Sequence, residues 1–112
     1  MEKLVLRHNN FIKHPKEEGV FMKHFFSSDD NDRLNNVEIK IEPGYQISYH
    51  VHEQASEFFY VVSGQGEFFV NREWVSIQKG DAMKAPIGEE HAVRNNSREI
   101  LVLFSTFSPP IR

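Results

Sequence analysis

The chain has 112 residues, with 13 basic and 16 acidic side chains, a net charge of −3 and no cysteine. This length predicts a single domain, and without a basic face we do not expect binding to nucleic acid. The lack of cysteine excludes disulfides, thiolate metal ligands, iron–sulfur clusters and a cysteine nucleophile in this chain.

The sequence also has no feature that predicts attachment to a membrane. The N-terminal residues have no apolar signal-peptide core, and no apolar run approaches the ~20 residues that span a bilayer. Lysine and arginine are scattered rather than clustered into a polybasic patch. We therefore expect a cytoplasmic protein.

Residues 1–35 form the less regular part of the chain. They contain a strand-like run at residues 20–26, followed by a polar stretch at residues 27–36 that carries Asp29, Asp30 and Asp32. This stretch lacks the glycine and the distal glutamate of an EF-hand calcium loop. We interpret it as a solvated loop that separates N-terminal strands from the rest of the domain.

From residue 36 to residue 112 the dominant period is two. Val37, Ile39 and Ile41 alternate with charged residues, as in a half-buried strand. Further runs rich in strand-forming residues cover residues 45–52, 57–62, 67–70, 74–78, 82–85, 91–94 and 100–107. Gly, Pro and Asn separate these runs at short intervals, and no helix of ten residues or more is indicated. The pattern predicts an all-β sandwich or barrel.

Four residues in these runs are candidate metal ligands. His50 and His52 are two residues apart, so on a strand their side chains leave the same face. Glu57 follows after a short polar link, and His91 comes after the turn at residues 86–88. Three imidazoles and one carboxylate favour Mn, Fe, Co, Ni, Cu or Zn over Ca or Mg. Histidines at this spacing also occur without a metal, and the other three, His8, His14 and His24, are interpreted as surface or interface residues.

Two stretches of the chain resemble the motifs of the cupin superfamily. The first motif, G-x5-H-x-H-x(3,4)-E-x6-G, is matched by Gly44, His50, His52, Glu57 and Gly64. The second motif, G-x5-P-x-G-x2-H-x3-N, is matched by Gly80, Pro86, Gly88, His91 and Asn95. The resemblance implies a cupin-type double-stranded β-helix, or jelly-roll barrel, over residues 36–112. It also implies His50, His52, Glu57 and His91 as the ligands of one metal ion.

The resemblance has a further implication for assembly. Cupins of this kind are often homodimers in which N-terminal strands cross to the partner. Residues 1–35 contain Val20, Phe21, Phe25 and Phe26, which are apolar for a segment outside the motifs. We expect a homodimer; the alternative for this segment is that it extends its own sheet.

The pocket beside the metal is predicted from strand parity. Phe59 shares the face of Glu57, and Gln46 and Ser48 share the face of His50. Together with Met83 and Phe104, Gln46 and Phe59 are the candidate substrate-binding residues, although aromatic side chains in a small barrel are also ordinary core. Glu53, Glu89 and Glu90 are expected to face solvent, so no second carboxylate stands out as a general acid or base.

The resemblance implies two kinds of function. Cupins with this ligand set include dioxygenases, isomerases, decarboxylases and lyases, so the first hypothesis is a metal-dependent enzyme acting on a small organic molecule. The alternative is a non-catalytic cupin that binds or senses a small ligand or a sugar. The sequence selects neither the substrate nor the metal.

Overall fold

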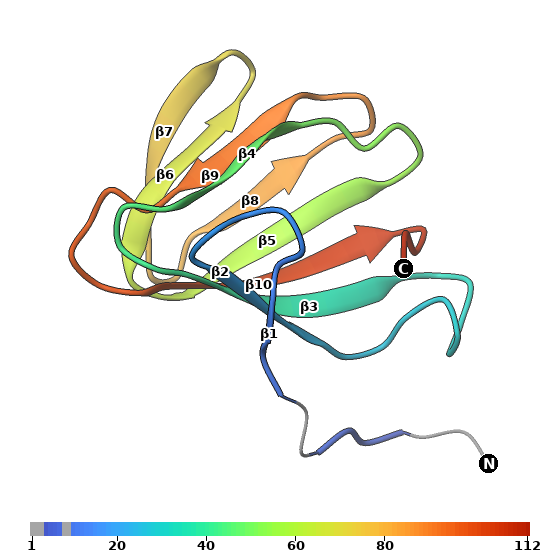
Figure 1. The fold of residues 1–112 in the computed structure, drawn as a ribbon. Coiled ribbons are helices and arrows are strands. Elements are labelled where there is room, and N and C mark those ends of the chain that lie inside the picture. The colour runs from blue at the N-terminus through green and yellow to red at the C-terminus, as the bar shows by residue number, and fades with distance from the viewer. Residues whose placement is uncertain (1–3, 8–9) are drawn as a thin grey trace.

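The computed structural model describes residues 4–7 and 10–112 and shows ten strands and no helix in this part of the chain (Figure 1). His8 lies outside the described residues. The strands are β1 Ile12–Lys13, β2 Val20–His24, β3 Asn35–Ile41, β4 Gln46–His50, β5 Ser56–Ser63, β6 Gln65–Val70, β7 Glu73–Gln78, β8 Ala82–Ala85, β9 His91–Arg94 and β10 Leu101–Ser108. No helix that could cross a membrane is found among the described residues.

The strands form two antiparallel sheets that face each other. The six-stranded sheet has the order β1-β2-β3-β10-β5-β8, and the four-stranded sheet has the order β4-β9-β6-β7. In Figure 1 the two sheets diverge toward the upper right, where the loop after β4 and the end of β10 lie. The predicted all-β class is confirmed, and the two sheets are consistent with a double-stranded β-helix.

The core explains why the period of two predicted these strands so well. In β3 and β10 every second residue is buried and the residues between them are half-buried. Val37, Ile39 and Ile41 of β3 and Leu101 and Leu103 of β10 face the other sheet and form one apolar cluster. Removing such side chains from water is the main contribution to the stability of a domain of this size.

Each predicted run overlaps an observed strand, with two differences from the prediction. β4 ends at His50, so His52 lies in the loop after the strand rather than on it. The two-residue β1 was not predicted and pairs with β2, while β2 pairs with β3. Within this chain the N-terminal segment therefore extends its own six-stranded sheet.

Gly64 makes the corner between the two sheets. It separates β5 from β6, which belong to different sheets, and its φ is +85°. A Cβ at this position would collide with the carbonyl oxygen of Ile100. Only glycine tolerates both conditions without strain, so the corner depends on this residue.

Candidate metal centre

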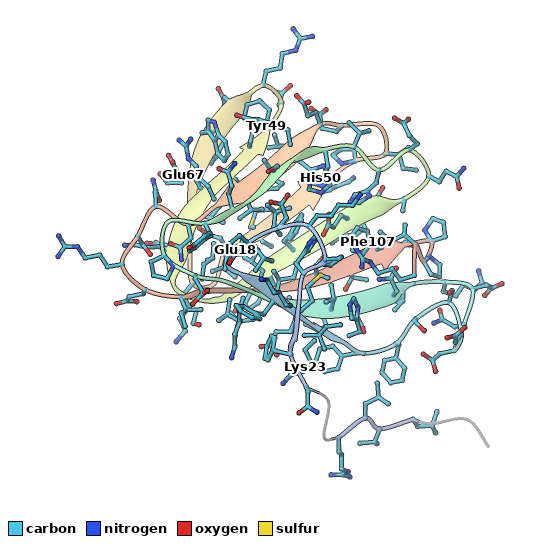
Figure 2. All side chains as sticks on the ribbon, in the orientation of Figure 1. Glu18, Lys23, Tyr49, His50, Glu67 and Phe107 are labelled. Carbon is cyan, nitrogen blue, oxygen red and sulfur yellow. The ribbon has the colours of Figure 1, made fainter. Side chains whose placement is uncertain are left out.

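The four predicted ligands come from both sheets at one end of the barrel. His50 ends β4 and is paired with His91, the first residue of β9, with ring centroids 4.1 Å apart. Glu57 lies near the start of β5 in the facing sheet. The ring of His52 lies 4.8 Å from that of His50 and 4.9 Å from that of Phe107. In Figure 2 the labels of His50 and Phe107 mark the two sheets at this end.

The ligand atoms converge on a small volume. One ligand atom from each of the four residues lies within 4.8 Å of all the others. Glu57 Oε1 is 3.0 Å from His91 Nε2 and 3.4 Å from His52 Nε2. Glu57 and His91 are buried, whereas His50 and His52 are half-buried. This cluster fits a single metal ion.

Backbone carbonyls orient two of the imidazoles. His50 Nδ1 lies 2.7 Å from the carbonyl oxygen of Ser48, and His91 Nδ1 lies 2.9 Å from that of Glu89. A carbonyl oxygen only accepts hydrogen bonds, so each Nδ1 carries a proton and Nε2 is the nitrogen that faces the centre. His91 Nε2 makes a hydrogen bond of 3.0 Å with Glu57 Oε1, so it must lose its proton before it can bind a metal. Such partners commonly fix the tautomer of metal-binding histidines.

His52 provides an independent test of whether a metal fits. Its Nε2 is buried and has no hydrogen-bond partner, because the approach to Glu57 at 3.4 Å is too long and poorly directed. A buried polar atom without a partner destabilises the protein by about 1–3 kcal/mol. A cation at the centre would supply the missing partner, and three nitrogens with one oxygen suit a first-row transition metal.

Ser105 is a residue of the site that sequence reasoning missed. It is fully buried in β10, and its Oγ donates a hydrogen bond of 2.5 Å to Glu57 Oε2. This contact leaves Oε1 as the oxygen that faces the histidines. A signal was present in the sequence, because Ser105 occupies an inward position between Leu103 and Phe107 where an apolar residue is expected.

The charges of the centre are coupled. Burial alone would raise the pKa of Glu57, but the nearby imidazole of His52 and the hydrogen bonds with His91 and Ser105 outweigh it and hold the pKa below its usual value. Burial alone would lower the pKa of His91, but the hydrogen bonds to Glu57 and to the Glu89 carbonyl outweigh it and raise the pKa. For His50 burial prevails and lowers the pKa. Glu57 therefore stays ionised, so it can accept a hydrogen bond from His91 or bind a metal cation.

Metal affinity is expected to fall on acidification, because each imidazole must lose its proton before it binds a metal. The raised pKa of His91 places the start of this loss above the ordinary histidine pKa of about 6.5. The lowered pKa of Glu57 means that the carboxylate does not contribute in the same range. Titrations with Co²⁺ from about pH 5.5 to about pH 8 test this order. An affinity independent of pH would argue against imidazole ligands.

A pocket of about 460 Å³ opens onto the four residues. Three of the four, His50, His52 and Glu57, line it directly. Its other walls combine apolar and polar side chains from both sheets, from the loop between β1 and β2, and from the C-terminal segment: His14, Pro15, Lys16, Glu17, Met22, Val37, Ile47, Ser48, Tyr49, Phe107 and Arg112.

The four predicted substrate-binding residues are placed differently from one another. Phe59 is buried, and its ring centroid lies 6.2 Å from that of His91. Met83 lines a separate pocket of about 320 Å³ between β6, β7 and β8. Phe104 is half-buried and packs against Phe25, with the two ring centroids 6.0 Å apart. None of these three lines the pocket at the metal centre.

Gln46 requires a correction of the predicted parity. The register between β4 and β9 shifts between Ile47 and His50, so one extra residue separates them in β4. Ile47 therefore packs on the core and lines the pocket with His50, whereas Gln46 is exposed and does not. A β-bulge of this kind reverses the face of every residue before it.

Comparison with known proteins decides the family. The cupin domain family matches residues 37–107. The chain belongs to this family. It is 32% identical over 78 residues to a protein described as an oxalate-binding protein of Thermotoga maritima, covering 68% of this chain and 64% of that protein. The chain thus spans less than two thirds of this relative, and a match to a Klebsiella pneumoniae mannose-1-phosphate guanylyltransferase spans 14% of that enzyme.

Solved structures share the fold over nearly the whole chain. A structure described as a predicted oxalate decarboxylase of Thermotoga maritima has a TM-score of 0.82 and 26% identity, covering 95% of this chain and 99% of that one. The structure of KdgF from Halomonas sp. has a TM-score of 0.77 and 27% identity, covering 89% of this chain and 86% of that one.

Proposed function

We propose that this cupin is a metal-dependent enzyme acting on a small organic acid, with a divalent first-row transition metal held by His50, His52, Glu57 and His91. The observation that carries the proposal is the convergence of four ligand atoms within 4.8 Å of one another, three of these residues lining a pocket. A pocket of about 460 Å³ is in the range that holds small molecules.

The chemistry of the pocket supports an acid as the ligand. A bound divalent cation would supply Lewis acidity and attract an oxygen donor such as a carboxylate. Met22, Val37 and Phe107 provide apolar walls that keep the rest of the ligand away from water. The relative described as oxalate-binding and the structure described as a predicted oxalate decarboxylase support the same class of ligand.

The test begins with the metal content of protein purified without a metal-affinity step. The Mn-, Fe- and Co-loaded forms are then assayed with oxalate and other small acids in air and under anoxia. Oxygen uptake with the iron form would indicate a dioxygenase, and turnover that is independent of oxygen would indicate a decarboxylase, isomerase or lyase. Protein that binds no first-row metal would refute the proposal.

A non-catalytic binding role is the second candidate. The observation that favours it is the relative described as oxalate-binding rather than as an enzyme. Micromolar binding of a small acid without turnover of any acid tested would select this role over the first.

We also propose that the chain forms a homodimer through the outer face of the six-stranded sheet. Phe58, Tyr60 and Val62 project from β5 on this face and are 44%, 49% and 38% exposed. Tyr60→Lys is expected to convert the dimer to a monomer in light scattering, because a buried lysine without a partner is costly. Val75→Lys, at a 43% exposed position on the other sheet, is the control. Wild-type protein that is monomeric at micromolar concentration would contradict this proposal.

A further inference from the structure

The metal-site pocket has one wall that the cupin motifs do not supply. The loop between β1 and β2 contributes His14, Pro15, Lys16 and Glu17 to the same pocket as His50, His52 and Glu57. Figure 1 shows this dark blue loop in front of β5, and hydrogen bonds to Ser48 fasten it to β4. A segment near the N-terminus therefore completes the pocket.

Two sets of hydrogen bonds hold Glu17 in this wall. Its Oε1 accepts the backbone N–H of Ser48 at 3.0 Å, and its Oε2 accepts the Ser48 hydroxyl at 3.3 Å. Within the loop, His14 Nδ1 accepts the backbone N–H groups of Lys16 and Glu17, both at 3.0 Å. The carbonyl of Ser48 in turn accepts the Nδ1–H of His50. Ser48 therefore links the Glu17 carboxylate to a candidate metal ligand.

Among the described residues that line the pocket, Glu17 and Glu57 are the two carboxylates. Glu57 is already engaged, because one oxygen accepts from Ser105 and the other faces His52 and His91. In the described part of the chain no cationic side chain lies at salt-bridge distance from Glu17. Its hydrogen bonds to Ser48 use only part of its capacity, since a carboxylate offers about four acceptor sites. It is therefore the carboxylate available to a ligand.

We propose that Glu17 determines ligand specificity and that the preferred ligands are small hydroxy carboxylic acids. In this arrangement, which rests on the proposed function, the ligand carboxylate faces the metal centre and the ligand hydroxyl donates a hydrogen bond to Glu17. An ionised carboxylate only accepts hydrogen bonds, so it favours a ligand that presents a donor on this side.

A dicarboxylate of similar size would be disfavoured at Glu17. Its second carboxylate would lie beside another negative charge and would need to take up a proton before it could bind there. Lys16 and Arg112 are exposed and also line the pocket. They attract acids of both classes, so they do not discriminate between them. Discrimination is assigned to Glu17.

The experiment compares glycolate with oxalate, which has a carboxylate in place of the CH₂OH group. Binding of each acid to the Co²⁺-loaded full chain is measured by calorimetry, with metal retention checked after each titration. Glu17→Gln is expected to weaken glycolate binding by roughly 10-fold or more while leaving oxalate binding equal or tighter. Glu18→Gln is the matched control, because Glu18 is exposed and pairs with Lys13 at the surface at 3.2 Å.

The outcomes separate this inference from the proposed function. If Glu17→Gln and wild type bind both acids with the same ratio of affinities, Glu17 has no role in specificity, and the metal proposal is unaffected. If wild-type protein holds no metal, or the loaded form binds neither acid, the proposed small-acid function fails and this inference fails with it. A changed ratio in Glu18→Gln as well would show a general charge effect and would also overturn the assignment.

Discussion

Replacing His50 with alanine is expected to weaken divalent metal binding by about 100-fold or more, since changes even to outer-shell partners of a metal site cost 10- to 100-fold. His50 is half-buried at the end of β4, so its removal takes one of four ligand atoms while leaving the apolar core intact. The measurement is the metal content after dialysis, together with a Co²⁺ titration followed by absorption. Circular dichroism checks that the β structure is retained.

Two further variants make this result interpretable. His24→Ala removes a histidine of β2 that is not part of the cluster, and full metal content is expected. His91→Ala removes a buried ligand and is also expected to lower thermal stability, because it leaves a cavity in the packed interior. Wild-type metal content in both His50→Ala and His91→Ala would contradict the assigned centre.

The local periodicity of the chain accounts for most of what could be predicted. β3, β5 and β10 bury alternate residues between the two sheets, so the period of two shows directly in the sequence of these strands. The spacing of His50 and His52 was interpreted with the same period, and the structure brings both residues together with Glu57 and His91. The bend that begins after His50 changes the element on which His52 lies without separating the two rings.

The face of Gln46 shows where periodicity stops being sufficient. Parity assumes an uninterrupted strand, but β4 gains one residue relative to β9 between Ile47 and His50. Such a bulge depends on pairing with a strand more than forty residues away, and the sequence around it carries no glycine to indicate it. Ile47 took the inward position because burial of its side chain is favourable.

Glu17 and Ser105 could not be placed in the site for a related reason. Glu17 contacts Ser48 across 31 residues, and Ser105 contacts Glu57 across 48 residues. Both contacts follow from how the sheets and the N-terminal loop come together, which no local pattern encodes. The polar residue at an inward strand position was the available signal for Ser105, because a buried hydroxyl needs a partner.

Ser105→Ala is expected to have a large effect on both metal affinity and stability. The variant leaves Glu57 Oε2 buried without its donor, which costs about 1–3 kcal/mol in the free energy of unfolding. It also removes a hydrogen bond that lowers the pKa of Glu57 and restrains which oxygen faces the histidines. Metal affinity should therefore fall by about 10- to 100-fold, as for other residues that orient a ligand.

The control and a conservative variant distinguish positioning from simple loss of packing. Ser108→Ala changes an exposed serine of the same strand, whose hydroxyl bonds the Arg33 carbonyl, and metal affinity should stay at the wild-type value. Ser105→Thr keeps the hydroxyl and should recover more affinity than stability, because its extra methyl group overpacks a filled core. If Ser105→Ala lowered the melting temperature but left the Co²⁺ affinity unchanged, the hydroxyl would serve the fold alone, since metal affinity is the readout that the orientation of Glu57 controls.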